Sequence, residues 1–365
     1  MKLGILGGGQ LARMLALAAY PLGIRTLCLD PKPDACVGDV TELMVADYND
    51  EKALNQFLSQ VDCVTIETEN IPLFCAEYII KARHFYPSAK ALEITQDRFF
   101  EKSLFKSLNI PTPTFIMVNS LDELTQSISE LGYPAVLKTR RFGYDGKGQY
   151  ILRSQSDILK SWSHLKSDSL ILEQFISFKN ELSLIAIRNK EGKTLFYPLI
   201  HNHHVGGVLH SSEAPFNNHL LQQEAEHHAL QILEALQYIG VITIEYFYDG
   251  SSLIANEIAP RVHNSGHWTI DGAQTSQFEN HLRAIFDLPL GSTEVIGNCF
   301  MLNCLGEMAP IKPCLSIPGV HYHMYGKPSL PGRKLGHITL VDSNLEYYKQ
   351  NKPLLESSLL HHIVT

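Results

Sequence analysis

Short apolar runs alternate with amphipathic segments over the first ninety residues of the chain. Leu3–Leu6, Thr26–Leu29 and Val61–Ile66 have the length and apolar character of strands, whereas Leu11–Ala19 carries apolar side chains at helical spacing. This alternation is typical of βαβ units, which build a parallel sheet covered by helices. We therefore predict a small, doubly wound, Rossmann-like α/β domain over residues 1–95.

Between Pro87 and residue 290, helical and strand-like segments follow each other without the regular alternation of the first ninety residues. A single helix is predicted between Pro87 and Pro113, from Asp97 to Leu108, because its apolar side chains form one face. Proline cannot continue a helix, so Pro111 and Pro113 mark a linker. The next segments mix strands and helices, as in an α+β domain. The predicted strands are 135–138, 149–152, 182–187, 195–200, 241–247 and 253–258, and the predicted helices are 222–236 and 277–286.

The last seventy residues contain three short apolar runs separated by proline and glycine, Cys299–Leu305, Val320–Tyr325 and His337–Val341. They predict a small β-rich domain. A chain of 365 residues is long enough for two or three domains. The predicted boundaries are 1–95, 96–290 with a mobile lid at about 113–170, and 291–365.

Charge and cysteine content exclude several classes of protein. Lys and Arg number 30 against 38 Asp and Glu, and no basic stripe stands out, so we expect no nucleic-acid partner. No apolar run reaches the roughly 18 to 20 residues that a membrane span needs. The chain opens on a strand and a glycine turn rather than a leader, so a cytoplasmic location is expected. The seven scattered cysteines fit neither a disulfide framework nor a zinc site, and we expect them reduced and buried.

The first glycine turn, residues 7–12, fits the pattern G-x-G-x-x-A, and Asp30 follows about twenty residues later. Glycines allow a tight turn, and the N–H groups of a helix N-terminus can bind phosphate. By itself this motif predicts a dinucleotide site. A phosphorylated substrate would suit the same turn, so both interpretations stay open.

A second glycine-rich loop, Gly143–Gln149, follows Lys138 at the end of a strand. Its N–H groups could close over a polyphosphate, although the segment is not a P-loop. An ordinary glycine turn with solvated cations is the alternative. Further along the chain, Glu173 ends an apolar run. The backbone there could form hydrogen bonds with an adenine ring while the Glu173 carboxylate binds ribose hydroxyls. The alternative is that Glu173 faces solvent.

Glu245 and Glu257 lie within apolar strands, where a carboxylate is costly to bury without compensation. With Asn256 they would suit Mg²⁺, which prefers hard oxygen ligands. Two exposed strand positions are the alternative. The loop 259–269 that follows is the most polar segment of the chain, and its Arg261 could bind a phosphate or carboxylate bidentately, unless the loop is only a well-capped turn.

Two other polar groups carry weaker signals. Arg333 and Lys334 could bind a phosphate or form a solvated basic turn. His201, His203 and His204 do not favour zinc, because alternate residues of a strand point to opposite faces and no acid or cysteine is near in sequence.

Taken in chain order, these segments resemble the ATP-grasp superfamily and, within it, the carboxyaminoimidazole ribonucleotide synthases. The resemblance covers nearly the whole chain and is weakest over the last twenty-five residues. NEIAPRVHNSGHWT discriminates best, because other enzymes on this scaffold carry different loops after the metal-binding strand. The other matching segments are GGGQLARML, DRFFEKSLF, KTRRFGYDGKGQ, EQFISFKNELSLI, FYPLIHN, GVITIEYF, GAQTSQFENHLRAI and PGRKLGHI.

The resemblance implies an ATP-grasp fold and a ligase of purine synthesis that carboxylates aminoimidazole ribonucleotide with ATP, bicarbonate and Mg²⁺, as one ion or two. It also implies a homodimer with small-molecule partners. Metal binding would fall to Glu245 and Glu257, and catalysis to Tyr144, Asp145, Arg261, His263 and Lys334, with Asp145 and His263 both open as the base. The implied ATP-binding residues are Arg98, Lys138, Gly143, Tyr144, Asp145, Gly146, Lys147, Gly148, Gln149, Glu173, Gln174, Phe175, Ile176, Glu181, His204, Asn256 and Glu257. The implied substrate-binding residues are Gln10, Arg261, His263, Asn264, Ser265, Arg333 and Lys334.

Three other functions remain open at this point. One is another ATP-grasp ligase, such as a glycinamide ribonucleotide transformylase, a biotin carboxylase or a D-alanine ligase. A nucleotide-binding module without turnover is the second, although Lys138, Glu245 and Glu257 argue against lost catalysis. The third is an NAD dehydrogenase, which rests on the first glycine turn alone.

Overall fold

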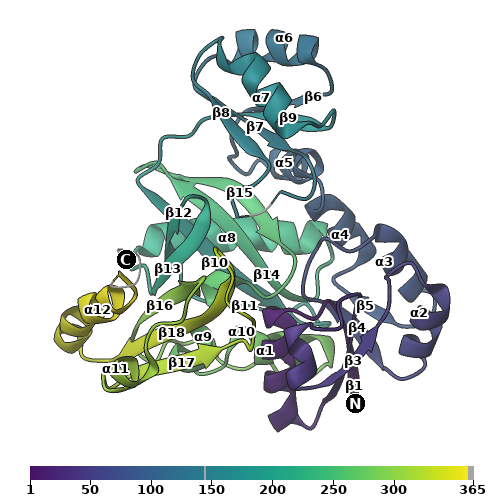
Figure 1. Ribbon diagram of the computed structural model, residues 1–365, viewed down its shortest axis with the longest axis vertical. Coiled ribbons are helices and arrows are strands. Elements are labelled where there is room, and N and C mark those ends of the chain that lie inside the picture. The colour runs from purple at the N-terminus through teal and green to yellow at the C-terminus, as the bar shows by residue number, and fades with distance from the viewer. Residues whose placement is uncertain (144, 361–365) are drawn as a thin grey trace.

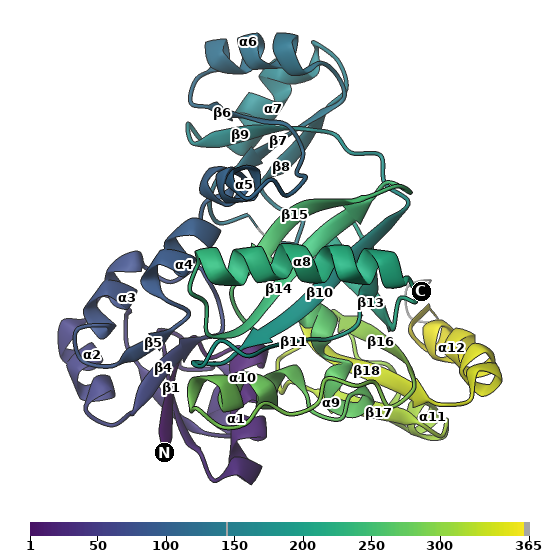
Figure 2. The ribbon, with the colours of Figure 1, turned by 180° about the vertical axis from the view of Figure 1, so that it is seen from behind.

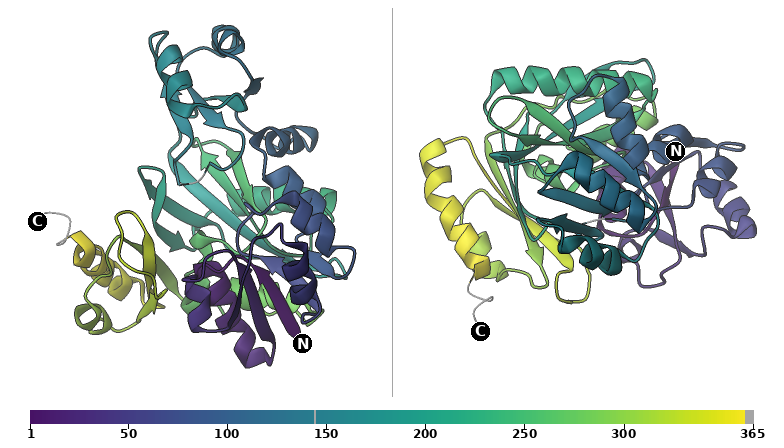
Figure 3. Two further views of the ribbon diagram at one scale, coloured as in Figure 1. Left: turned by 45° about the vertical axis from the view of Figure 1, so that its right-hand side comes forward. Right: turned by 90° about the horizontal axis from the view of Figure 1, so that it is seen from above.

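The computed structural model describes residues 1–143 and 145–360, arranged around three β-sheets (Figure 1). Segment 115–174 forms a separate lobe above the body of the molecule. The N-terminal sheet and the C-terminal strands lie on opposite flanks of the body, as Figure 3 also shows from two other directions. The fold is a mixture of α/β and α+β parts, as predicted.

The first sheet is parallel, with the order β3-β2-β1-β4-β5 that a doubly wound unit requires. Both faces of β1 are buried: Leu3 and Ile5 pack into one core and Leu6 into another, as the two-residue period of a strand dictates. The elements are β1 (Lys2–Leu6), α1 (Gln10–Ala19), η1 (Tyr20–Leu22), β2 (Arg25–Asp30), η2 (Cys36–Asp39), β3 (Glu42–Val45), α2 (Glu51–Leu58), β4 (Cys63–Ile66), α3 (Leu73–Ile79) and β5 (His84–Tyr86).

Two helices, and not the single one predicted, lie between Pro87 and Pro113: α4 (Ala89–Thr95) and α5 (Arg98–Ser107). The side chain of Ser88 caps α4 and that of Asp97 caps α5, each by accepting a hydrogen bond from a backbone N–H of the first turn. Each cap begins a helix, and α5 begins three residues after α4 ends at Thr95.

The separate lobe is a four-stranded antiparallel sheet of order β6-β9-β7-β8, covered by two helices that were not predicted. Leu121, Leu124 and Ile128 of the first helix recur at helical spacing and pack on the sheet. The elements are β6 (Phe115–Val118), α6 (Leu121–Leu131), β7 (Ala135–Thr139), β8 (Gln149–Leu152), α7 (Asp157–Leu165) and β9 (Leu170–Gln174).

A large antiparallel sheet forms the centre, in the order β15-β14-β10-β12-β13-β16-β18-β17, with β11 paired to β10. Helix α8 crosses one face of this sheet (Figure 2). The predicted strand over 195–200 is wrong, because Pro198 offers no N–H to a ladder and separates β11 from β12. The elements are β10 (Asn180–Arg188), β11 (Thr194–Phe196), β12 (Ile200–Val205), β13 (Val208–Ala214), α8 (His219–Ala235), β14 (Gly240–Tyr248), β15 (Leu253–Ala259), η3 (Asn264–Gly266), α9 (Thr269–Gly272) and α10 (Gln277–Ile285).

The C-terminal strands continue this central sheet, since β13 pairs with β16 and β16 with β18. The predicted β-rich segment is therefore joined to the centre by backbone hydrogen bonds. Two unpredicted helices pack beside it, the second with Pro353 inside. The elements are β16 (Asn298–Leu305), α11 (Ile311–Leu315), β17 (Val320–Met324), β18 (Lys334–Asp342) and α12 (Leu345–Leu360).

All seven cysteines are buried and unpaired, which confirms the prediction for them. Among the described residues, no helix combines the length and apolar character that crossing a membrane requires.

Candidate active site

A cavity of about 520 Å³ opens where the N-terminal sheet, the lobe and the central sheet meet. Its walls come from loops and strand ends of all three parts. Most of the residues implied by the sequence resemblance line it. They are Gln10, Arg98, Lys138, Gly143, Asp145, Gly146, Lys147, Gln149, Glu181, His204, Glu245, Asn256, Glu257, Arg261, His263, Asn264 and Lys334.

Some implied site residues do not form the cavity wall. Tyr144 lies outside the described residues. Glu173 and Ser265 are buried beneath the wall, where Ser265 Oγ lies 2.9 Å from Nδ1 of His263. The other described residues of the set that do not line the cavity are Gly148, Gln174, Phe175, Ile176 and Arg333.

Two lysines enclose Glu173. Its Oε2 lies 2.7 Å from Nζ of Lys138 and 3.6 Å from Nζ of Lys102. Burial alone would raise the pKa of Glu173, but the two ammonium groups outweigh it and lower the pKa to about 2. The solvent-facing alternative for Glu173 is therefore wrong, and the carboxylate positions Lys138 at the cavity. Lys102 was missed, although a lysine on the apolar face of a helix is a signal.

Glu245 and Glu257 stand directly opposite each other on β14 and β15. Like charges in that position repel, and each acid has a nitrogen partner: His263 Nε2 lies 3.1 Å from Glu245, and Arg98 Nη1 lies 3.1 Å from Glu257. Burial would raise the pKa of Glu245, but the hydrogen bond and charge of His263 lower it. The exposed-strand alternative fails for Glu245, which is largely buried.

The chemistry of these donors fits a hard cation. Beside the two carboxylates, the buried Oδ1 atom of Asn256 has no hydrogen-bond partner among the described residues. Three oxygen atoms of this kind suit Mg²⁺, which takes carboxylate and amide oxygens and keeps part of its water shell.

Arg261 forms a bidentate ion pair with Glu69, with distances of 2.5 Å and 3.0 Å. Both are largely buried, and Arg261 lowers the pKa of Glu69 against the opposing effect of burial. Arg261 thus lines the cavity with its guanidinium already oriented by a carboxylate of the protein, and its binding of a ligand remains a prediction. Glu69 was missed in the sequence, yet it follows β4, and residues beyond the carboxyl end of a parallel strand often form sites.

The first glycine turn holds a carboxylate of the protein itself. Glu67 accepts hydrogen bonds from the backbone N–H groups of Gly9 at 2.6 Å and Ala12 at 3.2 Å. A Cβ atom on Gly7 would lie 2.3 Å from Cγ of Glu67, so glycine is needed to admit this side chain. Glu67 occupies the helix N-terminus where a pyrophosphate would bind, and Asp30 accepts from Gly8 N–H at 2.8 Å. The N–H groups of Gly9 and Ala12 are therefore already taken, which argues against a dinucleotide pyrophosphate at this turn, whereas Gln10 of the same turn lines the cavity.

The lobe reaches the C-terminal strands across the cavity. Nζ of Lys334 on β18 lies 2.9 Å from Oδ1 of Asp145 in the glycine loop. Next to it, the loop meets the turn between β12 and β13 at two glycines: a Cβ on Gly207 would lie 2.5 Å from Cα of Gly146. The loop therefore lies closed over the cavity.

Of the three histidines in β12, His204 is the one that lines the cavity, and its Nδ1 lies 2.9 Å from Oε2 of Glu181. Burial lowers the pKa of His204, but the hydrogen bond to Glu181, together with the charges of Glu245, Glu181 and Glu257, outweighs this effect and raises it. His201 instead contacts Asn180.

Three domain families match consecutive parts of the chain. Residues 1–96 match the ribonucleotide synthetase preATP-grasp domain, and residues 103–278 match the ATP-grasp domain. Residues 299–351 match the phosphoribosylaminoimidazole carboxylase C-terminal domain.

Whole proteins match over almost the full chain. The N5-carboxyaminoimidazole ribonucleotide synthase of Pseudomonas aeruginosa is 49% identical over 340 residues, which cover 93% of this chain and 94% of that protein. The crystal structure of the Thermus thermophilus synthetase superposes with a TM-score of 0.94 at 47% identity, covering 98% of each chain. A structure of the Aspergillus clavatus enzyme with ADP and 5-aminoimidazole ribonucleotide gives a TM-score of 0.90 at 32% identity, with 98% of each chain covered. The chain therefore belongs to the N5-carboxyaminoimidazole ribonucleotide synthase family of the ATP-grasp superfamily.

Proposed function

We propose that the chain catalyses the ATP- and bicarbonate-dependent carboxylation of 5-aminoimidazole ribonucleotide to N5-carboxyaminoimidazole ribonucleotide, with release of ADP and phosphate. The observation that carries this proposal is the contact of Asp145 with Lys334 over a cavity that also holds Arg261 and His263. It places groups from the lobe, the central sheet and β18 around one enclosed volume. Two substrates with different polar groups can meet there.

ATP would lie under the glycine loop, with its phosphates near Lys138 and Arg98. Glu173 and Glu257 fix these two cations in place, so little reorganisation is needed when the phosphates bind. Glu245 and Glu257, with Asn256, would hold Mg²⁺, which neutralises phosphate charge when bound.

In the first step, an oxygen of bicarbonate attacks the γ-phosphorus, the bond to the β-phosphate oxygen breaks, and ADP leaves. The product, carboxyphosphate, hydrolyses readily, so the closed loop protects it from water. Lys138 and Arg261 would stabilise the developing negative charge.

In the second step, the exocyclic amine of the ribonucleotide attacks the carboxyl carbon, either of carboxyphosphate or of CO₂ released from it, and phosphate leaves. One amine proton must be removed, and Asp145 and His263 are the candidates because both line the cavity. Lys334 would bind the ribonucleotide together with Asn264 and Gln10, while Ser265 positions His263.

Oxygen transfer tests this reaction. With ¹⁸O-labelled bicarbonate, phosphate released during turnover should carry one label, because the attacking oxygen stays on phosphorus. The transfer should depend on 5-aminoimidazole ribonucleotide. Unlabelled phosphate would mean that water attacks ATP, and the proposed function would then fail.

The remaining assignments rest on the family resemblance. We propose a cytoplasmic homodimer with domains 1–95, 96–290 and 291–365 and a lid at about 113–170. Light scattering at several concentrations tests the dimer, and a monomer at all of them would contradict it.

A further inference from the structure

A group of imidazoles and one carboxylate lies outside the cavity. His321 and His323 are two residues apart on β17 and so share one face of the strand. His337 on β18 stands directly opposite His323 in the antiparallel register. Asp271 of α9 faces them. Three imidazoles and a carboxylate thus converge from two strands and a helix.

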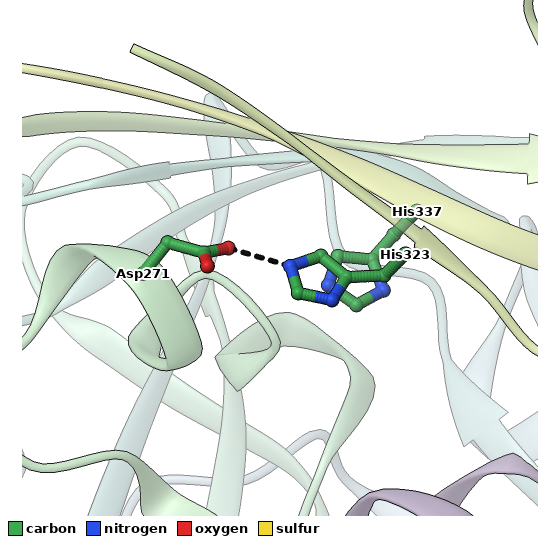
Figure 4. A group of neighbouring side chains, drawn as sticks. All are labelled: Asp271, His323 and His337. Atoms are coloured by element: carbon green, nitrogen blue, oxygen red, sulfur yellow. Dashed lines mark hydrogen bonds and ion pairs between the residues drawn. The ribbon is translucent and has the colours of Figure 1, made fainter. Parts of the chain in front are cut away.

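The contacts within this group are close. His323 Nε2 lies 2.8 Å from one oxygen of Asp271, and His321 Nδ1 lies 3.5 Å from the other. The rings of His323 and His337 stack with centroids 4.4 Å apart. Figure 4 shows both rings on the same side of Asp271, one behind the other.

His337 supplies the observation that points to a ligand. The residue is fully buried, and its Nε2 atom has no hydrogen-bond partner among the described residues. Its Nδ1 lies 2.7 Å from the hydroxyl of Tyr325, which leaves Nε2 on the side of the ring toward Asp271 and His323 (Figure 4). In the tautomer whose Nδ1 donates to Tyr325, Nε2 carries a lone pair and can act as a ligand.

We propose that Asp271, His323 and His337 form a binding site for a transition-metal ion of the Zn²⁺ type. Imidazole and carboxylate donors suit this ion, and three protein ligands with one water complete a tetrahedron. Tyr325 holds the second nitrogen of His337, as the outer partners of metal-bound imidazoles do.

The donor atoms already lie near one another. Candidate donor atoms of Asp271, His323 and His337 all lie within 4.8 Å of one another. Tetrahedral zinc with Zn–N bonds of about 2.0 to 2.1 Å needs donors about 3.3 Å apart. A bound ion would tie the β17–β18 pair to α9. Through Tyr325 and His267, whose hydroxyl and Nδ1 lie 3.1 Å apart, it would also brace the loop at Asn264.

Zinc titration of the chelator-treated, full-length protein tests the site. Saturating Mg²⁺ and ADP are present so that the acids of the cavity are occupied. Isothermal titration calorimetry should give one Zn²⁺ per chain, and Co²⁺ should give the visible absorption of a tetrahedral ion. In His323→Ala, the Zn²⁺ affinity should fall by more than about 100-fold.

Two controls make the test specific. His219→Ala removes an exposed histidine outside the group, and Glu257→Gln alters the cavity; both should bind Zn²⁺ like the unmodified protein. Asp271→Asn keeps the size of the side chain and should also weaken binding, so the proposal stays testable if His323→Ala does not fold. No Zn²⁺ binding by the unmodified protein, or equal binding by Asp271→Asn, overturns the proposal. These readouts do not depend on carboxylation activity.

Discussion

The ammonium group of Lys334 lies 2.9 Å from Oδ1 of Asp145, although the two residues are 189 positions apart in the chain. Asp145 belongs to the glycine loop of the lobe, and Lys334 begins β18 at the far side of the cavity. The ion pair therefore connects the glycine loop of the lobe to the C-terminal part of the molecule. In the proposed mechanism, this connection encloses the reacting groups.

Replacing Lys334 by Met should impair use of the ribonucleotide more than use of ATP. Methionine keeps most of the length and the apolar stem of the lysine, so the protein should still fold. We expect the KM for 5-aminoimidazole ribonucleotide to rise by about tenfold or more, the effect of losing roughly 1.4 kcal/mol of binding. Steady-state kinetics measure this. Lys349→Met, on the exposed face of α12, is the control, and an unchanged KM in Lys334→Met would refute the assignment.

Closure of the lid should depend on Gly207. Its φ is +82°, and a Cβ would lie 2.5 Å from Cα of Gly146, so alanine would push the glycine loop away. Gly207→Ala should lower kcat for carboxylation by about tenfold, a barrier change of roughly 1.4 kcal/mol, and raise the share of ATP hydrolysed without carboxylation.

The neighbouring glycine provides a matched control for this experiment. Gly206 has a φ of +60°, but a Cβ there would meet open space. Gly206→Ala should therefore cost about 1 to 2 kcal/mol of stability from backbone strain and leave the coupling of ATP use to carboxylation intact. If both variants hydrolyse the same share of ATP without carboxylation, contact with Gly146 is not the cause of the uncoupling.

Glu173 should be important for stability. In Glu173→Gln, Lys102 and Lys138 would lose their buried carboxylate, and such a change costs about 3 to 5 kcal/mol. Urea unfolding measures the loss. Glu346→Gln, an exposed acid, should change stability by less than about 0.5 kcal/mol, and a similarly small effect at Glu173 would contradict the buried network.

The same carboxylate predicts a pH dependence. Its pKa is about 2 in the folded protein and about 4.3 in an unfolded chain, so the folded state holds its proton less tightly. The stabilisation is therefore complete above about pH 4.3 and is lost as the pH falls toward 2. The difference in stability between the unmodified protein and Glu173→Gln should narrow over that range.

Glu257→Gln should raise the Mg²⁺ concentration needed for activity. It removes one of two facing carboxylates, and we expect an increase of about tenfold or more, comparable to the loss of a supporting metal contact. Activity against total Mg²⁺ at fixed ATP measures it. Glu213→Gln, whose carboxylate pairs with Lys352 away from the cavity, is the control. An unaltered Mg²⁺ requirement would exclude Glu257 as a ligand.

The sequence predicted much of the fold because its signals are local. The alternation over the first ninety residues identified the parallel sheet, and the position of Lys138 before Gly143–Gln149 identified the loop over the cavity. It placed one helix at Asp97–Leu108, which corresponds to α5, but missed α4, whose seven residues are too few for a clear helical period. Nor did it show that β16 pairs with β13, because the apolar pattern of a strand does not say which distant strand lies beside it.

The features of the site that the sequence analysis misread or missed also depend on contacts between residues far apart in the chain. The turn at Gly7–Ala12 fits a dinucleotide fingerprint, yet its N–H groups are taken by Glu67, 58 residues after Gly9. Glu69, which pairs with Arg261 from 192 residues away, was not predicted at all. The backbone turn is the same for a carboxylate of the protein as for a phosphate, so the motif alone could not distinguish them.

The most direct test of the central claim is ADP release by the purified protein with ATP, Mg²⁺ and bicarbonate, in the presence and absence of 5-aminoimidazole ribonucleotide. The proposed function predicts slow release without the ribonucleotide and strong stimulation by it, with one ADP formed per amine carboxylated. ADP release that ignores the ribonucleotide but responds to another amine would contradict the proposed substrate.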